Sequence, residues 1–92
     1  MAPRVVHKKI WREYFDEVAS GRKKFELRLA DFDIGEGDTL VLEEWDKDKQ
    51  AHTGRKLETT VTYALKTRDI SFWPKEDIDK HGLQILQIEV KR

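Results

Sequence analysis

One short segment, residues 21–28, holds the side chains best suited to chemistry. Lys24, Glu26 and Arg28 alternate with apolar residues, so a strand here would place these charges on one face. Lys23 lies where a helical turn would enter that strand. Arginine can donate two hydrogen bonds to a phosphate or base edge, lysine is a mobile cation, and a carboxylate accepts hydrogen bonds from exocyclic amino groups. The pattern indicates a ligand-binding face; the competing interpretation is a surface ion pair, which contributes little stability.

A second basic group, His7, Lys8 and Lys9, lies near the N-terminus and is a candidate phosphate contact. His7 can also act as a base or a ligand, although the sequence places no partner for it. The histidines are not at metal-ligand spacing, and Asp31-x-Asp33 lacks the rest of a calcium loop. We therefore predict no metal site and no cofactor.

Length and composition limit the remaining possibilities. The 92 residues are predicted to form one domain, residues 1–92, because a domain of this size already has difficulty burying enough apolar surface. The absence of cysteine excludes disulfides and thiol nucleophiles. No apolar run has signal-peptide or membrane-spanning length, so a cytoplasmic protein without membrane contacts is expected. Since the formal net charge is zero, nucleic-acid binding would require local clusters of positive charge.

The first half of the chain is predicted to supply a strand, a helix and a second strand. Residues 4–8 are typical of a short strand, and residues 10–18 show apolar side chains at helical spacing before Ser20-Gly21. The stripe expected to face the core consists of Ile10, Trp11, Tyr14, Phe15 and Val18. The expected buried face of the next strand consists of Phe25, Leu27 and Leu29.

The second half is predicted to complete a sheet. Residues 39–45 and 56–65 are predicted strands on either side of a polar loop at 46–54. Gly35-x-Gly37-Asp38 is predicted to form a tight turn before the first of these strands, and the run Leu40-Val41-Leu42 in that strand is expected to be covered on both sides. The apolar residues expected on one face of the later strand are Leu57, Val61, Tyr63 and Leu65. A short helix with Pro74 near its first turn is expected within residues 70–81, followed by a strand at 83–90. This order predicts an α+β fold in which a mixed, mainly antiparallel sheet curls into a small β-barrel, with one main helix and a short second helix.

Five groups of residues, taken together, resemble one known domain family. They are His7-Lys8-Lys9-Ile10-Trp11, Glu13-Tyr14-Phe15, Gly21-x-Lys23-x-Phe25-Glu26-x-Arg28, Gly37-Asp38-x-Leu40-x-Leu42-x-Glu44-Trp45 and Thr53-Gly54-Arg55. In this order they resemble the ASCH domain, specifically its small DUF3850-type branch. The resemblance spans most of the chain and is weakest over residues 66–82.

The resemblance implies a PUA-like β-barrel with a cleft, and a role in RNA binding in translation or RNA metabolism. Lys23, Glu26 and Arg28 would line that cleft. Its aromatic partners are not identified, although Trp45 and Trp73 can stack on a base if they are exposed. The full set of predicted nucleic-acid-binding residues is Lys23, Lys24, Glu26, Arg28, His7, Lys8 and Lys9.

The resemblance also suggests an enzyme as an alternative. Some ASCH-like proteins are amidohydrolases that remove the acetyl group from N4-acetylcytidine and use a Lys of this motif to activate a Thr three positions later. Lys23 matches that Lys, whereas Glu26 stands in the place of the Thr and removes the nucleophile. A hydrolase acting on a modified nucleoside, or a ribonuclease, would then use Lys23 and Glu26 as catalytic residues, with Glu26 as a general base on water and Glu76 as a candidate third acidic group. A protein-interaction domain is a third hypothesis, since fold does not determine function.

Overall fold

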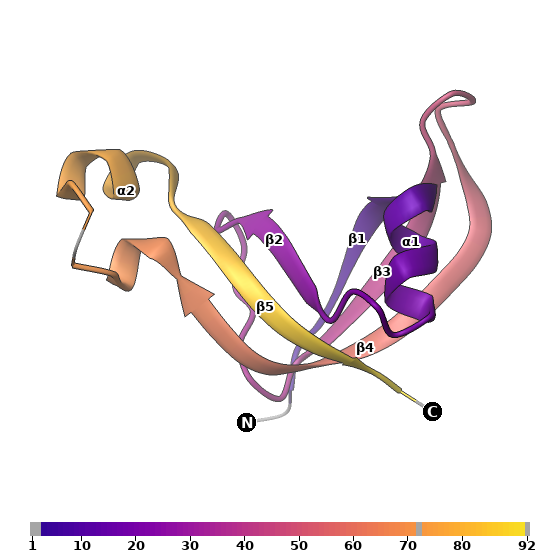
Figure 1. The fold of residues 1–92 in the computed structure, drawn as a ribbon, viewed down its shortest axis with the longest axis horizontal. Coiled ribbons are helices and arrows are strands. Elements are labelled where there is room, and N and C mark those ends of the chain that lie inside the picture. The colour runs from indigo at the N-terminus through magenta and orange to yellow at the C-terminus, as the bar shows by residue number, and fades with distance from the viewer. Residues whose placement is uncertain (1–2, 72, 92) are drawn as a thin grey trace.

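Five strands form one curled sheet in the order β1-β3-β4-β5-β2 (Figure 1). The computed structural model describes residues 3–71 and 73–91. Its elements are β1 (Val5–Trp11), α1 (Arg12–Ala19), β2 (Phe25–Leu29), β3 (Thr39–Asp46), β4 (Ala51–Lys66), the 3₁₀ turn η1 (Thr67–Asp69), α2 (Lys75–His81) and β5 (Leu83–Val90). β1 and β3 are parallel, and the other neighbouring strands are antiparallel. The predicted α+β class, with a mainly antiparallel curled sheet, one main helix and a short second helix, is confirmed.

β4 gives the sheet its curl. It is 16 residues long, pairs with β3 along its first part and with β5 along its second part, and carries a bulge between Val61 and Tyr63. A bulge bends a strand and increases its twist. The curl brings the edge strands β1 and β2 together, and Arg28 Nη2 donates a hydrogen bond across the gap to the Lys9 carbonyl oxygen at 2.7 Å. The sheet is therefore a half-barrel, open between β1 and β2.

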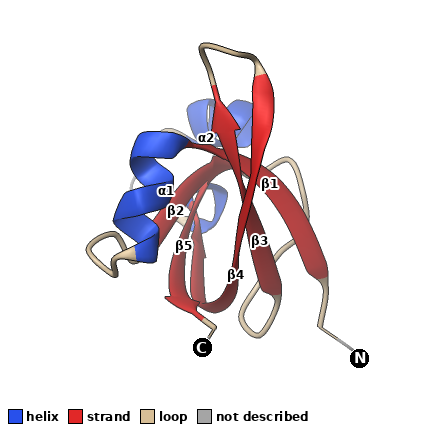
Figure 2. Ribbon diagram, turned by 90° about the vertical axis from the view of Figure 1, so that its right-hand side faces the viewer, coloured by secondary structure: helices blue, strands red, loops and turns tan. Residues whose placement is uncertain are grey.

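The inner face of the curl forms the hydrophobic core. Leu40, Leu42 and Leu86 are fully buried there. α1 packs against β1 and β3 and adds Phe15 and Val18 to the same cluster. Figure 2 shows α1 on one side of the strands, and Figure 1 shows α2 at the other end of the sheet. Within residues 3–71 and 73–91, no helix is both long and apolar enough to span a bilayer.

The helix begins two residues later than predicted, and only part of the stripe predicted to face the core is buried. β1 continues through Trp11, and only α1 side chains on one side, Phe15 and Val18, are buried as predicted. The prediction that Trp11 and Tyr14 face the core is wrong, since they are 47% and 46% exposed. Adjacent residues of a helix point about 100° apart, so a stripe that contains neighbouring aromatics cannot bury all of them against one surface.

The assignment of faces in β2 is inverted. Phe25, Leu27 and Leu29, predicted to be buried, are about half exposed, at 49%, 55% and 54%, whereas Glu26 is only 3% exposed. Glu26 is paired with the fully buried Leu86 on the inner face. Period-two alternation separates the two faces of a strand but does not say which of them lies inside, and the curl decides this.

The β3–β4 hairpin also differs from the prediction. The loop expected at 46–54 is shorter, because β4 already begins at Ala51. Val61 is buried as expected, but Tyr63 and Leu65 lie on the outer face and are 59% and 38% exposed. The bulge between Val61 and Tyr63 inserts one residue, which reverses the facing of every later side chain in β4.

Candidate functional site: a cleft between two sheet edges

The opening between β1 and β2 is a cleft of about 520 Å³. Its lining residues are Lys9, Ile10, Trp11, Tyr14, Lys23, Phe25, Glu26, Leu27 and Arg28. They come from the end of β1, the first turn of α1, the residue Lys23 before β2, and β2 itself. A volume of this size lies within the range of small-ligand sites.

A charged triad of Lys23, Glu26 and Arg28 lies at the base of this cleft. Lys23 Nζ donates to Glu26 Oε1 at 2.7 Å, and Arg28 Nε donates to Glu26 Oε2 at 2.9 Å. The Glu26 side chain is 4% exposed, and those of Lys23 and Arg28 are 19% and 23% exposed. A carboxylate buried to this degree requires charged or hydrogen-bonding partners, and two cations provide them.

Local structure fixes the triad. Gly21 has a φ of 86°, in the region that favours glycine, and this ends α1 with a tight turn. The Lys23 amide then donates to the Glu17 carbonyl at 3.0 Å, so the chain enters β2 in one direction. Lys23 Nζ also donates to the Phe25 carbonyl at 2.7 Å. Both the backbone and the side chain of Lys23 are therefore positioned before any ligand binds.

Two aromatic side chains, Trp11 and Tyr14, flank the triad. Their rings are 6.2 Å apart between centroids and nearly parallel, with an interplanar angle of 18°. Both are about half exposed, and Lys23 Nζ lies 6.0 Å from the centre of the Tyr14 ring. Neither was predicted as a site residue. Trp11 ends β1 and Tyr14 lies in the first turn of α1, and their three-residue separation across this junction is the signal that could have set them apart from the buried Phe15 and Val18.

Only part of the predicted nucleic-acid-binding set comes together. Lys9 lines the cleft with the triad, although its Nζ lies 4.2 Å from the centre of the Trp45 ring on the outer face. His7 Nδ1 lies 3.1 Å from Glu43 Oε2 on the outer face, outside the cleft. Lys8 Nζ lies 4.0 Å from the centre of the Phe32 ring, also outside the cleft.

The predicted aromatic partners do not line the cleft either. Trp45 is half-buried and meets the ring of His52 edge-on, with 5.0 Å between ring centroids. Trp73 is 57% exposed and lines a separate hollow near α2. Trp11 and Tyr14 occupy the cleft position that was predicted for these two tryptophans.

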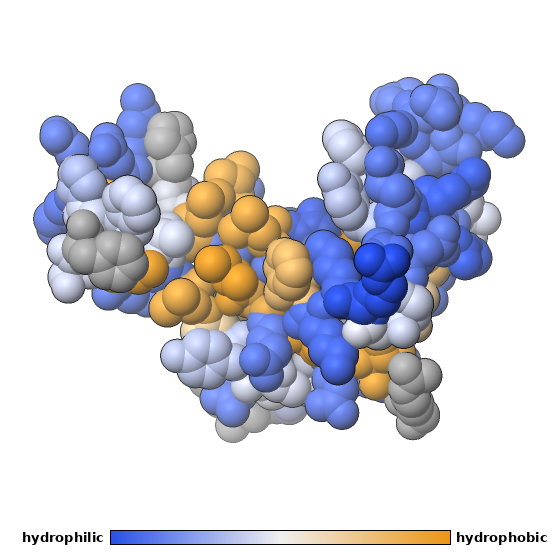
Figure 3. Space-filling model, in the orientation of Figure 1, coloured by the Kyte–Doolittle hydropathy of each residue, from blue (hydrophilic) through white to orange (hydrophobic). Residues whose placement is uncertain are grey.

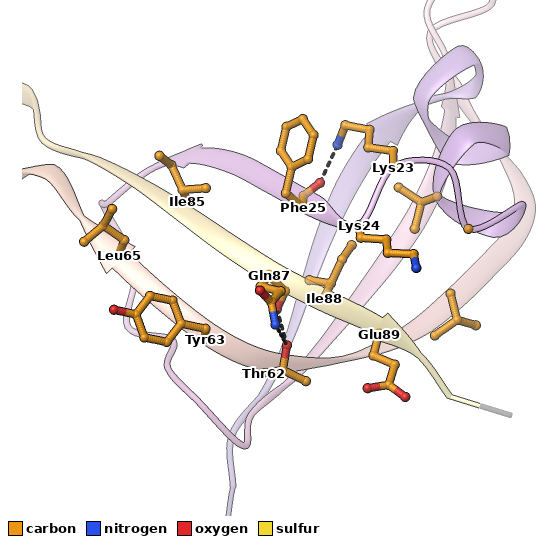
Figure 4. A pocket seen from close by; sticks show the side chains of 13 residues that line it. Lys23, Lys24, Phe25, Thr62, Tyr63, Leu65, Ile85, Gln87, Ile88 and Glu89 are labelled. Atoms are coloured by element: carbon orange, nitrogen blue, oxygen red, sulfur yellow. Dashed lines mark hydrogen bonds between the residues drawn. The ribbon is translucent and has the colours of Figure 1, made fainter.

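A larger hollow of about 860 Å³ lies beside the cleft (Figure 4). Lys24, which was predicted to share the site, lines this second hollow and not the cleft. Other residues that line this second hollow include Phe25, Tyr63, Leu65 and Ile85, which are labelled in Figure 4. The second hollow is mainly an apolar surface of β4 and β5, whereas the cleft combines aromatic rings with a charged triad.

A second buried ion cluster connects α1 to the β3–β4 hairpin. The fully buried Glu44 accepts hydrogen bonds from Arg55 and from the hydroxyl of Thr53, and Arg55 also donates to Asp16 at 2.8 Å. The Arg55 hydrogen bond, with smaller contributions from Thr53 and Arg12, lowers the pKa of Glu44 from 4.5 to about 2. The Thr53-Gly54-Arg55 motif thus has a structural role outside the cleft.

The Gly-Asp motif has a similar role at the start of β3. Gly37 has a φ of 93° and forms the tight turn that the sequence predicted. Asp38 is buried and accepts hydrogen bonds from the Arg4 amide at 2.8 Å, the Arg4 guanidinium at 2.9 Å and the Gly35 amide at 2.8 Å. The Arg4 amide is the main cause of the lowered pKa of Asp38. This cluster fixes the start of the parallel β1–β3 pair.

The charged side chains of the triad are paired with one another. Both oxygens of Glu26 accept hydrogen bonds from cations, Oε1 from Lys23 and Oε2 from Arg28. Among the described residues that line the cleft, Glu26 is the sole carboxylate. In the part of the chain that the structure describes, no three His, Asp or Glu side chains form a group that could hold a metal ion.

The chain is similar to known proteins in sequence and in fold. The model of the family described as "Domain of unknown function (DUF3850)" matches residues 6–77. The "Uncharacterized 12.9 kDa protein in GpA 3'region" of Escherichia phage P2 is 34% identical over 93 residues, covering 99% of this chain and 81% of the phage protein. The crystal structure of the hypothetical protein PH0355 has a TM-score of 0.65 and 19% sequence identity, covering 95% of this chain and 99% of that one. The likeness to PH0355 shows a shared fold.

Proposed function

The chain belongs to the DUF3850 family, and from that premise we propose that its cleft binds an unpaired nucleotide of RNA. One observation carries the proposal: a paired Lys–Glu–Arg triad and two half-exposed aromatic rings line the same cleft. Protein sites for single-stranded RNA combine these two features, with aromatic faces for the bases and cations for base edges or phosphates.

The aromatic rings supply the stacking surface. Trp11 and Tyr14 expose about half of their area at the cleft, and their rings stack nearly parallel to each other, with 6.2 Å between centroids. Exposed aromatic side chains are costly to leave in water, and a planar base covers them without requiring a particular sequence. An exposed aromatic face of this pair therefore favours a flat, unpaired base over a duplex.

The triad supplies positive charge in a fixed position. Glu26 binds Lys23 through one carboxylate oxygen and Arg28 through the other. The Lys23 ammonium has three N–H donors, and its hydrogen bonds to Glu26 and to the Phe25 carbonyl use two of them. The other Lys23 donor and the remaining guanidinium hydrogens of Arg28 can meet acceptor atoms of a base or phosphate. In this proposal Glu26 orients the two cations and does not read an amino group itself.

Substitution of Trp11 with alanine is expected to weaken binding of a fluorescent single-stranded RNA by about 5- to 150-fold, because stacking on an aromatic ring is worth about 1–3 kcal/mol per base. Fluorescence anisotropy at low salt measures the dissociation constants. Trp73→Ala is the matched control, since Trp73 is 57% exposed but lies outside the cleft. Equal affinities of the two variants, or no RNA binding by the wild-type protein at low salt, would contradict the proposal.

The hydrolase alternative is tested with the same protein. Incubation with N4-acetylcytidine and with labelled RNA, with and without a divalent cation, is expected to leave both unchanged, because both oxygens of Glu26 are held by cations. Chromatography of the nucleoside and gel analysis of the RNA give the result. Turnover that Glu26→Gln abolishes while the variant stays folded would support the hydrolase instead.

A further inference from the structure

The outer face of β2, β4 and β5 carries an unusual number of exposed apolar side chains. We refer to the following set as the apolar face: Phe25, Leu27, Leu29, Tyr63, Leu65, Leu83 and Ile85, each 38–59% exposed. Figure 3 shows apolar side chains gathered over these strands, between α2 and the charged surface around α1. Single exposed apolar residues are normal on a protein surface, but a contiguous group is not.

Strand register shows that this group is contiguous. Leu27 of β2 is paired with Ile85 of β5, and Ile85 is paired on its other side with Leu65 of β4. The row before it consists of Phe25, Gln87 and Tyr63 in the same order. Gln87 is the one polar residue within these two rows, and neither row contains a charge.

The apolar face is large enough to form most of an interface. If a side chain of this kind presents roughly 150–200 Å² when fully exposed, the exposed fractions correspond to roughly 500–700 Å² in total. Monomeric proteins rarely leave contiguous apolar patches beyond a few hundred Å² uncovered. A standard protein interface buries about 800 Å² on each partner, so the apolar face with its rim approaches that size.

We propose that a second copy of this chain covers the apolar face, so that two sheets pack face to face around a two-fold axis. In a two-fold dimer the same patch meets itself, and any charge inside it would lie near its own copy. An uncharged patch avoids this repulsion, and sheets that pack face to face lie about 10 Å apart. Lys24 and Glu89 line the hollow beside the apolar face, so the rim offers both signs of charge for a second copy.

This dimer would adjoin the proposed RNA site, because Phe25 and Leu27 line the cleft and also belong to the apolar face, but it would not cover the triad or the two site aromatics. Glu26 and Arg28 point to the inner side of β2, opposite the apolar face, and Trp11 and Tyr14 lie on other elements. The dimer and the RNA site are therefore separate proposals, and each can fail without the other.

Sedimentation velocity of the wild-type chain from micromolar to millimolar concentration tests the proposal. The expected result is a dimer whose fraction rises with concentration and persists at high salt, because the interface is apolar. Ile85→Lys places a cation in the centre of the apolar face, and Leu27→Lys does so on β2; each is expected to raise the dimer dissociation constant by at least about tenfold.

Val5→Lys is the matched control, because Val5 is 60% exposed but lies on β1, at the opposite edge of the sheet. Circular dichroism and thermal melting establish that each variant is folded. A wild-type chain that is monomeric at every concentration would overturn the proposal. The apolar face would then be covered by another protein or left uncovered. Equal dimer dissociation constants for folded Ile85→Lys and Val5→Lys would also overturn it.

Discussion

Glu44→Gln is expected to lower the free energy of unfolding by about 1.5–3 kcal/mol, because it removes the charge-assisted hydrogen bonds of a buried carboxylate. Glu44 is 2% exposed and accepts hydrogen bonds from Arg55 and Thr53, whereas the half-exposed Arg55 keeps Asp16 as a partner. The cluster also connects β3 to α1 through Asp16. Urea unfolding monitored by circular dichroism measures the difference.

Glu43→Gln is the matched control for this substitution. Glu43 is the neighbouring residue, is only partly buried and pairs with His7 on the outer face. Exposed ion pairs contribute about 0–1 kcal/mol, so this variant should unfold near the wild-type urea concentration. If the two variants lose the same stability, the buried cluster has no special role.

The same carboxylate makes stability depend on acid pH. The pKa of Glu44 in the folded protein is about 2, below its ordinary 4.5, so the unfolded chain binds the proton more readily. Its contribution is fully present above the ordinary pKa and is lost as the pH falls from about 4.5 to about 2. That difference corresponds to about 3 kcal/mol.

The acid profile of Glu44→Gln should therefore be shallower than that of the wild type. A residual slope is expected, because backbone hydrogen bonds from Arg4 and from Lys49 lower the pKa of Asp38 and of Asp46 in the same direction. Urea unfolding at a series of pH values from neutral to acid gives both profiles. Identical slopes in the two proteins would show that Glu44 does not titrate as described.

Glu26→Gln is expected to cost about 3 kcal/mol or more of stability and to weaken RNA binding as well. The substitution leaves Lys23 and Arg28 in a partly buried site without the carboxylate that separates them. The two cations then repel each other and lose their fixed positions. Urea unfolding measures the loss of stability. Fluorescence anisotropy on the same preparation, without denaturant and with the variant folded, measures RNA binding.

A triple substitution separates the two effects. When all charges of a buried ion network are replaced by apolar residues of similar size, stability is often restored. Lys23→Met, Glu26→Leu and Arg28→Met together should therefore recover most of the stability that Glu26→Gln loses, while RNA binding stays weak. A triple variant that binds RNA like the wild type would remove the triad from the proposed site.

Sequence patterns were informative about elements and less so about surfaces. The strands, the main helix and the short second helix were predicted near their observed positions, because periodicity and the turn residues Gly21, Gly37 and Pro74 are local signals. The buried run Leu40, Val41 and Leu42 was also predicted correctly, since a run without alternation belongs to a strand covered on both faces.

The segment with Lys23, Glu26 and Arg28 could be selected from the sequence, because residue type and spacing are local properties. Only the tertiary structure decided which face of this segment points inward. Because the sheet curls at β4, Glu26 of β2 faces the core, Phe25 and Leu27 are exposed, and Trp11 from the other edge strand lies at the cleft. Inside and outside are set by which elements cover a strand, and that covering depends on long-range pairing that the alternation of a single strand does not encode.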